Sequence, residues 1–237
     1  MGMLKTVRGS SRRAFFLLVL LLGAIGLVAA QDFESLVEEG NSLAEEGLYE
    51  EALRAYNQAI EINSEVADAY YNRGTIQMEL GNLEAAIGDF DRALEIREDF
   101  GEAYFNRGNA AYRLDEYAQA VDDYSSALDL VDNRAELLHN RGLAHYGMGN
   151  LEDAIVDFTE AIAGRENYTR AFFNRGVVNY DAGSYRAAVE DFRRVLDAEP
   201  ENAQALYNIG AAYIRLSREV GNPEESTAPD DGSANGN

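Results

Sequence analysis

The sequence predicts an all-α fold in which antiparallel helix pairs stack into a right-handed superhelical α-solenoid. Three observations support this prediction. A five-residue motif repeats with a period of 34 residues. Within each period, apolar residues recur at helical spacing in two runs, and in most periods a glycine separates these runs. The copies of this motif are Tyr70–Gly74, Tyr104–Gly108, Leu138–Gly142, Phe172–Gly176 and Leu206–Gly210.

The composition is that of a folded and strongly acidic protein. Its 237 residues are 46% apolar, which is ample for a core. Residues 1–30 carry four basic and no acidic side chains, so residues 31–237 hold 16 basic and 42 acidic side chains, a net charge of -26. This charge repels nucleic acid and anionic lipid. Because there is no cysteine, disulfides, thiol nucleophiles and thiolate metal sites are excluded.

The first thirty residues have the pattern of an export signal. A basic stretch, Lys5–Arg13, precedes the apolar run Ala14–Ala30, and small residues at Val28–Ala30 favour cleavage before Gln31. An uncleaved membrane anchor is the alternative, since seventeen apolar residues are close to the length that spans a bilayer. Ser11–Phe15 also resembles a twin-arginine signal, although the very apolar run favours the general secretory route. We therefore expect a bacterial periplasmic protein, with tethering to the inner membrane as the second option.

The repeats are numbered so that the recurring glycine holds position 8. They then span 33–66, 67–100, 101–134, 135–168 and 169–202, followed by a capping helix over 203–220. The tail 221–237 is polar and acidic with almost nothing to bury, so we expect it to be disordered.

Small and aromatic residues alternate at fixed positions of each repeat. A glycine inside a helix lowers the stability of the helix by about 1 kcal/mol relative to alanine. Because glycine recurs at position 8 in every repeat, we expect the second helix to approach closely at this position. Alanine at position 20 is the expected partner of this glycine, and a large ring always follows at position 24. The residues are Gly40, Gly74, Gly108, Gly142, Gly176 and Gly210 at position 8, Ala52, Ala86, Ala120, Ala154 and Ala188 at position 20, and Tyr56, Phe90, Tyr124, Phe158 and Phe192 at position 24.

This pattern resembles the tetratricopeptide repeat family over residues 33 to about 220. The chain departs from the family pattern at position 4, where the tryptophan slot holds other apolar residues, and at Asp115, which replaces a turn glycine. The resemblance implies helical hairpins whose neighbours complete one core and whose first helices line a concave groove.

A charged pair recurs where the family usually has an apolar residue. Position 7 is arginine and position 23 is aspartate in the four middle repeats, and both are missing together in the first repeat. We predict a partly buried ion pair between the two helices of each hairpin, with an arginine that points at a ligand as the alternative. The predicted pairs are Arg73–Asp89, Arg107–Asp123, Arg141–Asp157 and Arg175–Asp191.

Two rows of side chains are predicted to line the groove. The resemblance implies that positions 5 and 6 face inward, where asparagine amides can hold the backbone of an extended peptide and rings can contact it. The alternative for the rings is packing between adjacent first helices. The rows are Asn72, Asn106, Asn140, Asn174 and Asn208 at position 6, and Tyr71, Phe105, His139, Phe173 and Tyr207 at position 5, with Met78, Tyr112, Tyr146 and Tyr180 at position 12.

Two other functions of such a repeat array are rejected on the residues. The cations with which chaperone-binding members of the family clamp a C-terminal carboxylate are missing from the matching positions. His139 and His145 are six residues apart and do not share a helix face, so a metal site is not expected. Motifs of phosphate binding, calcium binding and nucleophilic catalysis are missing as well. Asn167–Thr169 fits a glycosylation sequon, which matters only in a eukaryotic secretory pathway.

The sequence thus predicts an exported, non-enzymatic scaffold that binds an extended peptide or a partner protein in its groove without a cofactor. The alternative is a self-associating scaffold of the envelope whose groove is filled by another copy or by its own tail.

Overall fold

The structure is a computed structural model that describes residues 32–221. The predicted signal or anchor over 1–30 and all but the first residue of the predicted tail 221–237 lie outside these residues. The chain divides into two compact units between Ala110 and Ala111. Residues 32–221 fold into helices and contain no strand.

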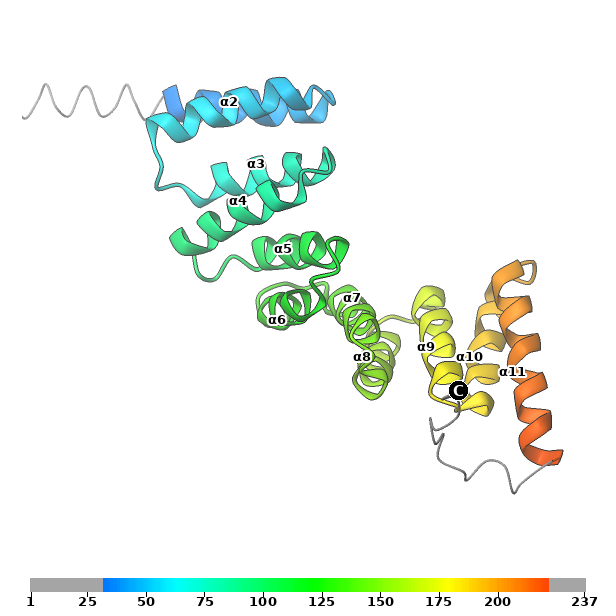
Figure 1. Cartoon of the computed structure of the whole chain (residues 1–237). Coiled ribbons are helices and arrows are strands. Elements are labelled where there is room, and N and C mark those ends of the chain that lie inside the picture. Colours follow the sequence, from blue (N-terminus) through cyan, green and yellow to red (C-terminus); the bar gives the residue numbers. More distant parts are fainter. Residues whose placement is uncertain (1–31, 222–237) are drawn as a thin grey trace, which may run out of the picture. The chain divides into compact units, whose positions relative to one another are not determined.

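The first unit holds two helical hairpins and the start of a third (Figure 1). A helix over residues 32–45 is followed by α2, Tyr49–Ile62, and then α3, Ala67–Glu79, pairs with α4, Leu83–Ile96. Helix α5, Gly101–Arg113, begins in this unit and ends just past the division.

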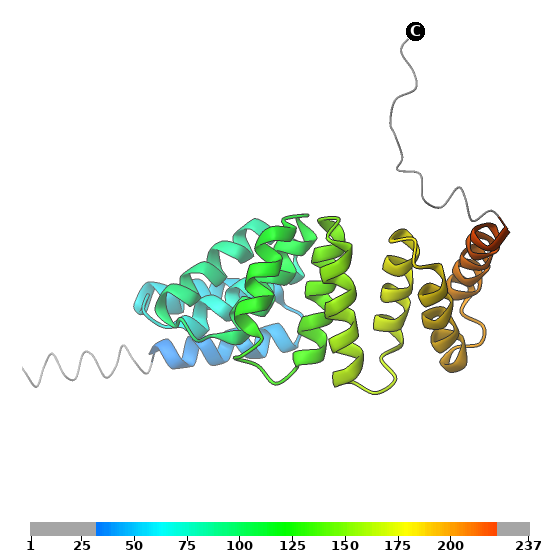
Figure 2. The same ribbon diagram turned by 90° about the horizontal axis from the view of Figure 1, so that it is seen from below.

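The second unit continues the same pattern (Figure 2). Its helices are α6, Tyr117–Ala127; α7, Arg134–Gly147; α8, Leu151–Gly164; α9, Thr169–Asp181; α10, Tyr185–Ala198; and α11, Ala203–Gly221. Helix α7 packs on α8 and α9 on α10, while α8 contacts α9 and α10 contacts α11. The predicted all-α fold of paired helices is confirmed.

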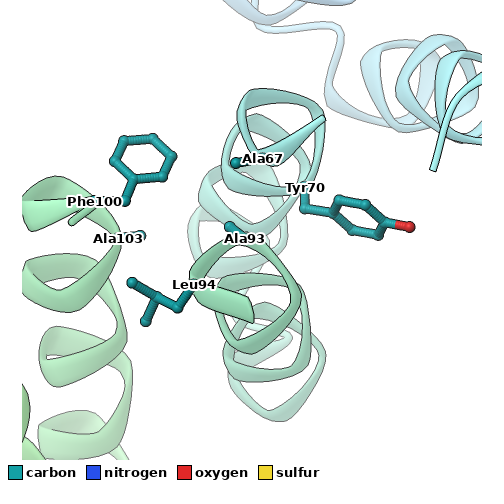
Figure 3. Packing of buried hydrophobic residues seen from close by; sticks show 6 residues of the cluster. All are labelled: Ala67, Tyr70, Ala93, Leu94, Phe100 and Ala103. Atoms are coloured by element: carbon teal, nitrogen blue, oxygen red, sulfur yellow. The ribbon is translucent and has the colours of Figure 1, made fainter. Parts of the chain in front are cut away.

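The core follows the small and aromatic positions of the repeat. The alanines at position 20 and the rings at position 24 are fully buried. So are the alanines at position 27, which are Ala59, Ala93, Ala127 and Ala161. Between hairpins, the first unit buries a cluster from α3, α4 and the start of α5, in which Leu94 of α4 lies near Phe100 and Ala103 (Figure 3). Since a single hairpin leaves one apolar face bare, each hairpin depends on the next to complete its core.

The glycine at position 8 meets the ring of position 24 rather than the alanine of position 20, which corrects the expected partner. A Cβ added at Gly74 would lie 2.9 Å from Cε1 of Phe90, and one at Gly142 would lie 3.0 Å from the same atom of Phe158. The close approach is therefore edge-on between a ring of the second helix and the backbone of the first. A methyl group at position 8 would force this ring out of place.

The turn inside each hairpin needs a left-handed backbone. Gly47, Gly81, Gly149 and Gly183 take φ between 75° and 81° at position 15. Asp115 takes φ 60° at the same position of the third repeat, so it holds the turn at the steric cost of its Cβ. Its carboxylate accepts a hydrogen bond of 2.5 Å from the hydroxyl of Tyr117, which offsets part of that cost.

Candidate functional site

The arginines of position 7 form bidentate ion pairs with the aspartates of position 23. Arg141 donates from Nε to Asp157 at 2.8 Å and from Nη2 at 2.7 Å, and the aspartate side chain is only 3% exposed. Arg73 holds Asp89 in the same way at 2.9 and 2.5 Å. Arg175 reaches Asp191 at 3.0 Å through Nε and at 2.7 Å through Nη2. Three of the four predicted pairs thus lie within one unit each, and Arg107 with Asp123 stays a prediction because these two residues belong to different units.

The third nitrogen of each arginine reaches back to position 25 of the preceding repeat. The Nη1 atoms donate at 2.6 to 3.0 Å to an amide, a carboxylate and two hydroxyl groups. The pairs are Arg73 with Asn57, Arg107 with Asp91, Arg141 with Ser125 and Arg175 with Thr159. In the three repeats whose Arg–Asp pair lies within one unit, one guanidinium therefore joins two helices of its own repeat to the repeat before it, and we call this arrangement the arginine clamp.

The hydroxyls of the clamp are oriented by their own helix. Ser125 and Thr159 each donate to the backbone carbonyl four residues earlier, at 2.7 Å, so their lone pairs remain to accept from the arginine. The hydrogen bond to Asp157 raises the pKa of Arg141, and the bond to Asp89 raises that of Arg73. Each guanidinium thus stays charged and is largely occupied by protein partners, which favours the structural role over a ligand-binding one.

The asparagine row of the first unit is half-buried and partly bonded. The side-chain nitrogen of Asn72 donates to Oδ1 of Asn41 at 3.0 Å, and that of Asn106 donates to the hydroxyl of Tyr71 at 3.1 Å. Both bonds reach to the preceding repeat. They leave the carboxamide oxygens of Asn72 and Asn106 without a donor among the described residues, and these oxygens can accept a hydrogen bond from a ligand.

The second unit repeats this arrangement with a histidine in place of the tyrosine. Nδ2 of Asn174 lies 2.9 Å from Nε2 of His139, and Nδ1 of the same ring lies 3.2 Å from Oδ1 of Asn140. An amide donor at Nε2 and an amide acceptor at Nδ1 suit the neutral ring that carries its proton on Nδ1. Burial lowers the pKa of His139, which also favours the neutral form. Asn208 on α11 is half-buried.

The rings of position 5 pack mainly between helices, which is the alternative given for them. His139 is 5% exposed, and its centroid lies 5.5 Å from that of Phe158 and 5.2 Å from that of Tyr168. Tyr71 packs in the same way at 4.7 Å from Phe100. These side chains are held in the core by rings from the second helix and from the end of the same repeat. The prediction that His139 lines the groove is therefore wrong: His139 is a core residue, and its ring orients Asn174.

The remaining rings of this row differ in exposure. Phe173 contacts Phe192 edge-on at 5.8 Å, and both Phe173 and Phe105 are half-buried. Tyr207 is 77% exposed. At position 12, the hydroxyl of Tyr146 donates to the carboxylate of Asp181 at 2.5 Å, and Arg215 donates to the hydroxyl of Tyr180 at 3.3 Å. The surface beside the asparagines of the second unit is consequently a mixture of bonded tyrosines and charges.

A hollow of about 820 Å³ opens elsewhere in the second unit, beside the last arginine clamp. Phe172, Arg175, Asp191 and Arg194 are among the residues that line it. Because Arg175 is occupied by Asp191 and Thr159, the hollow offers few free donors, and its charges are of both signs. No cluster of metal-ligating side chains occurs in residues 32–221, and no helix of this part is long and apolar enough to span a bilayer.

Comparison with family models decides which family the repeats belong to. Models described as TPR repeat and Tetratricopeptide repeat match residues 40–81, 67–100, 101–133, 135–163 and 179–217. The chain is a tetratricopeptide repeat protein. The tetratricopeptide repeat fold suggests a scaffold for protein–protein interaction, and none of the matching models indicates a catalytic family. No curated protein matches this tetratricopeptide repeat chain in sequence.

Several solved tetratricopeptide repeat structures have the same fold. YrrB, described as a TPR protein with an unusual peptide-binding site, is 24% identical with a TM-score of 0.68, over 73% of this chain and 89% of its own. MamA from Desulfovibrio magneticus is 20% identical with a TM-score of 0.69, over 73% and 97%. A tetratricopeptide repeat protein from Parabacteroides merdae is 22% identical with a TM-score of 0.70, over 80% and 75%.

Position 25 is the part of the arginine clamp that we did not predict from the sequence. The signal is nevertheless present, since an acceptor stands at position 25 in each repeat that precedes an arginine at position 7. The fifth repeat has Arg193 there, and the following position 7 is Ile209, which needs no acceptor. Arg193 instead donates to the hydroxyl of Tyr213. The two positions change together, as expected of residues that bond across a repeat boundary.

Proposed function

We propose that this tetratricopeptide repeat protein binds an extended segment of a partner protein through the asparagines at position 6 of its first helices, chiefly through the segment's backbone. The observation that carries the proposal is the bonding of Asn72, Asn106 and Asn174. In each of them one amide hydrogen is used by the preceding repeat, while the carboxamide oxygen and the second amide hydrogen have no partner among residues 32–221 and can bond a ligand.

The bond to the preceding repeat fixes the direction of each amide. A free asparagine side chain loses rotamer entropy when it binds a ligand, whereas one that is already held loses less. An oxygen and an N–H group side by side match the N–H and C=O groups of an extended peptide. Such a row is indifferent to the side chains of the peptide. The described peptide-binding site of YrrB, a protein of the same fold, supports a peptide as the ligand.

The proposal is tested with linear peptides selected from a displayed library against the purified protein. Each hydrogen bond contributes about 0.5 to 1.5 kcal/mol, so Asn174→Ala should weaken binding by a factor of roughly 2 to 12, and the variant with all five asparagines replaced should weaken it much more. Fluorescence anisotropy of a labelled peptide measures this loss. Asn150→Ala is the matched control, because Asn150 precedes α8 without a side-chain cap bond.

Two modified peptides separate backbone recognition from side-chain recognition. Methylation of the peptide nitrogens removes backbone donors and should abolish binding, whereas a scrambled order of the same residues should bind nearly as well as the original. Equal binding by the wild type and the fivefold variant would refute the groove. Loss of binding on scrambling, with tolerance of methylation, would refute the backbone mode.

We also propose that the protein is exported, with cleavage before Gln31. The supporting observation is the basic stretch, apolar run and small residues of positions 1–30. Intact-mass measurement on the chain recovered from a periplasmic fraction should give a protein that begins at Gln31. A full-length chain in the inner-membrane fraction would support the anchor instead, and recovery of the full-length chain from the cytoplasm would refute export.

A further inference from the structure

The last helix, α11, exposes an apolar face that the corresponding helices bury. Leu206 is 51% exposed and Tyr207 is 77% exposed, whereas the residues at the same repeat positions in α7, Leu138 and His139, are 2% and 5% exposed. Ile214 and Tyr213 both lie about two turns after Leu206 on the same face and are 56% and 41% exposed. In α7 the corresponding face is covered by the second helix of its hairpin, α8.

Gly210 shows that this face has the form of a helix-docking surface. At position 8 of the first, second, fourth and fifth repeats the glycine lies against a ring of the second helix, and a Cβ added at Gly176 would lie 2.9 Å from Phe192. A Cβ added at Gly210 would meet nothing within 4 Å. The space that the glycine provides for a neighbouring helix is therefore present on α11 and is not filled by any described residue.

The residues that follow α11 are unsuited to fill it. The segment 222–237 contains no aromatic residue and no leucine, isoleucine, valine or methionine. At the positions where the other repeats place a ring and a small residue, 24 and 27, it has Ser226 and Pro229. A proline there would also interrupt a helix. The segment thus has little apolar surface to exchange for the surface of α11.

The exposed residues are arranged symmetrically about the glycine. Leu206 and Ile214 both lie four residues from Gly210, and Tyr207 and Tyr213 both lie three residues from it. In an antiparallel pair of identical helices with a two-fold axis beside Gly210, each residue faces the one equally far on the other side. Leucine then faces isoleucine, tyrosine faces tyrosine, and the two glycines allow the backbones to meet.

We propose that α11 is a dimerisation surface on which the α11 of a second copy takes the place of a second helix. The charges agree with this arrangement, since Arg218 would face Asn202 of the second copy, next to Glu201. Helix α11 has 19 residues and is therefore about 28 Å long. A strip of that length and about 10 Å width is smaller than the roughly 800 Å² per partner of a standard interface, so the dimer is weak and reversible.

Disulfide trapping tests a weak dimer directly, because the natural chain has no cysteine. Gly210→Cys in the full chain places two thiols beside the two-fold axis, within the Cα separation of about 4.4 to 6.8 Å that a disulfide requires. Under mild oxidation it should form a covalent dimer at least tenfold faster than Val156→Cys, whose side chain on α8 is 53% exposed. Equal rates for the two variants would mean random collision and would overturn the proposal.

Two further variants test the register and the occupant. Tyr207→Cys and Tyr213→Cys should cross-link with each other more readily than either does with itself, and the reverse order would overturn the two-fold arrangement. Removal of residues 222–237 should leave the rate of the Gly210→Cys variant unchanged. A tenfold rise in this cross-linking rate on removal would show that the segment covers α11. A cross-link to a different protein in cells would show a different partner. Either result would overturn the proposal.

Discussion

The contact between the position 8 glycine and the position 24 ring makes opposite predictions for two glycines of one hairpin. Gly74 of α3 and Gly88 of α4 are both helical, and replacing either by alanine should gain about 1 kcal/mol of helix propensity. A methyl group at Gly88 would meet nothing within 4 Å. At Gly74 it would lie 2.9 Å from Phe90 and 3.1 Å from Cβ of Asp89.

The two neighbours of Gly74 have little freedom to move. Phe90 is fully buried, and Cβ of Asp89 is fixed by its own helix and by the bond of its carboxylate to Arg73. Overpacking of this kind costs about 1 to 3 kcal/mol. We therefore expect Gly88→Ala to raise the free energy of unfolding by about 1 kcal/mol, and Gly74→Ala to lower it by up to about 2 kcal/mol.

Unfolding by guanidinium chloride, followed by circular dichroism, measures the change in the free energy of unfolding for both variants. The gain in helix propensity is the same for both, so it cancels in the difference between the two changes. Replacing Phe90 by leucine shortens the side chain above Gly74, so the cost of Gly74→Ala should shrink in the Phe90→Leu background. If Gly74→Ala and Gly88→Ala stabilise the protein equally, the ring does not need the glycine, and our explanation of position 8 is refuted.

Three other predictions concern the clamp, the histidine and the turn. Arg141→Leu and Asp157→Leu should each lower the free energy of unfolding by about 3 to 5 kcal/mol, but the double variant by much less than their sum, and additive values in a double-mutant cycle would contradict the pair. Burial lowers the pKa of His139 below its ordinary value of 6.5. The unfolded chain therefore binds more protons, and stability should fall as pH drops below about 6.5; this fall should be smaller in His139→Phe, as thermal unfolding at pH 5 and pH 7.5 would show. Asp115→Gly should raise the free energy of unfolding by up to about 1 kcal/mol, because φ is 60° there, and an unchanged chemical-denaturation midpoint would disprove strain at this turn.

The helices, the hairpins and the ion-paired residue types were predictable because each depends on contacts inside one repeat. A glycine at position 8, a ring at position 24 and an Arg–Asp match recur at fixed spacing, so a single period carries the information. The exception was the partner of the glycine. Alanine at position 20 and the ring at position 24 lie on the same helix face, and only coordinates show which of the two meets the backbone.

The groove side of the candidate site was harder to predict, because it depends on the end of the repeat as well as on its first helix. Tyr71 and His139 occur in the two repeats that end in a ring, Phe100 and Tyr168, and each packs on that ring. The polar atom of Tyr71 and that of His139 then each bond the asparagine of the next repeat. Phe105, in a repeat that ends in Arg134, has no polar atom to offer. We predicted five equivalent groove rings at position 5. The structure instead shows two kinds of residue there: Tyr71 and His139 pack on the last ring of their repeat and bond an asparagine, whereas Phe105 between them has no polar atom for such a bond.

The arginine clamp also explains why α11 differs from the helices before it. Each clamp holds a first helix to the second helix of its own repeat and to position 25 of the repeat before, so it needs an arginine at position 7 and two acceptors. At α11 both requirements fail, because position 7 is Ile209 and position 25 of the fifth repeat is Arg193. Buried Ala205 and Ala212 and the bond between Arg193 and Tyr213 hold α11 to the fifth repeat instead. These contacts leave Leu206, Tyr207 and Ile214 of α11 exposed, and apolar side chains of that kind can exchange water for an apolar partner at little desolvation cost.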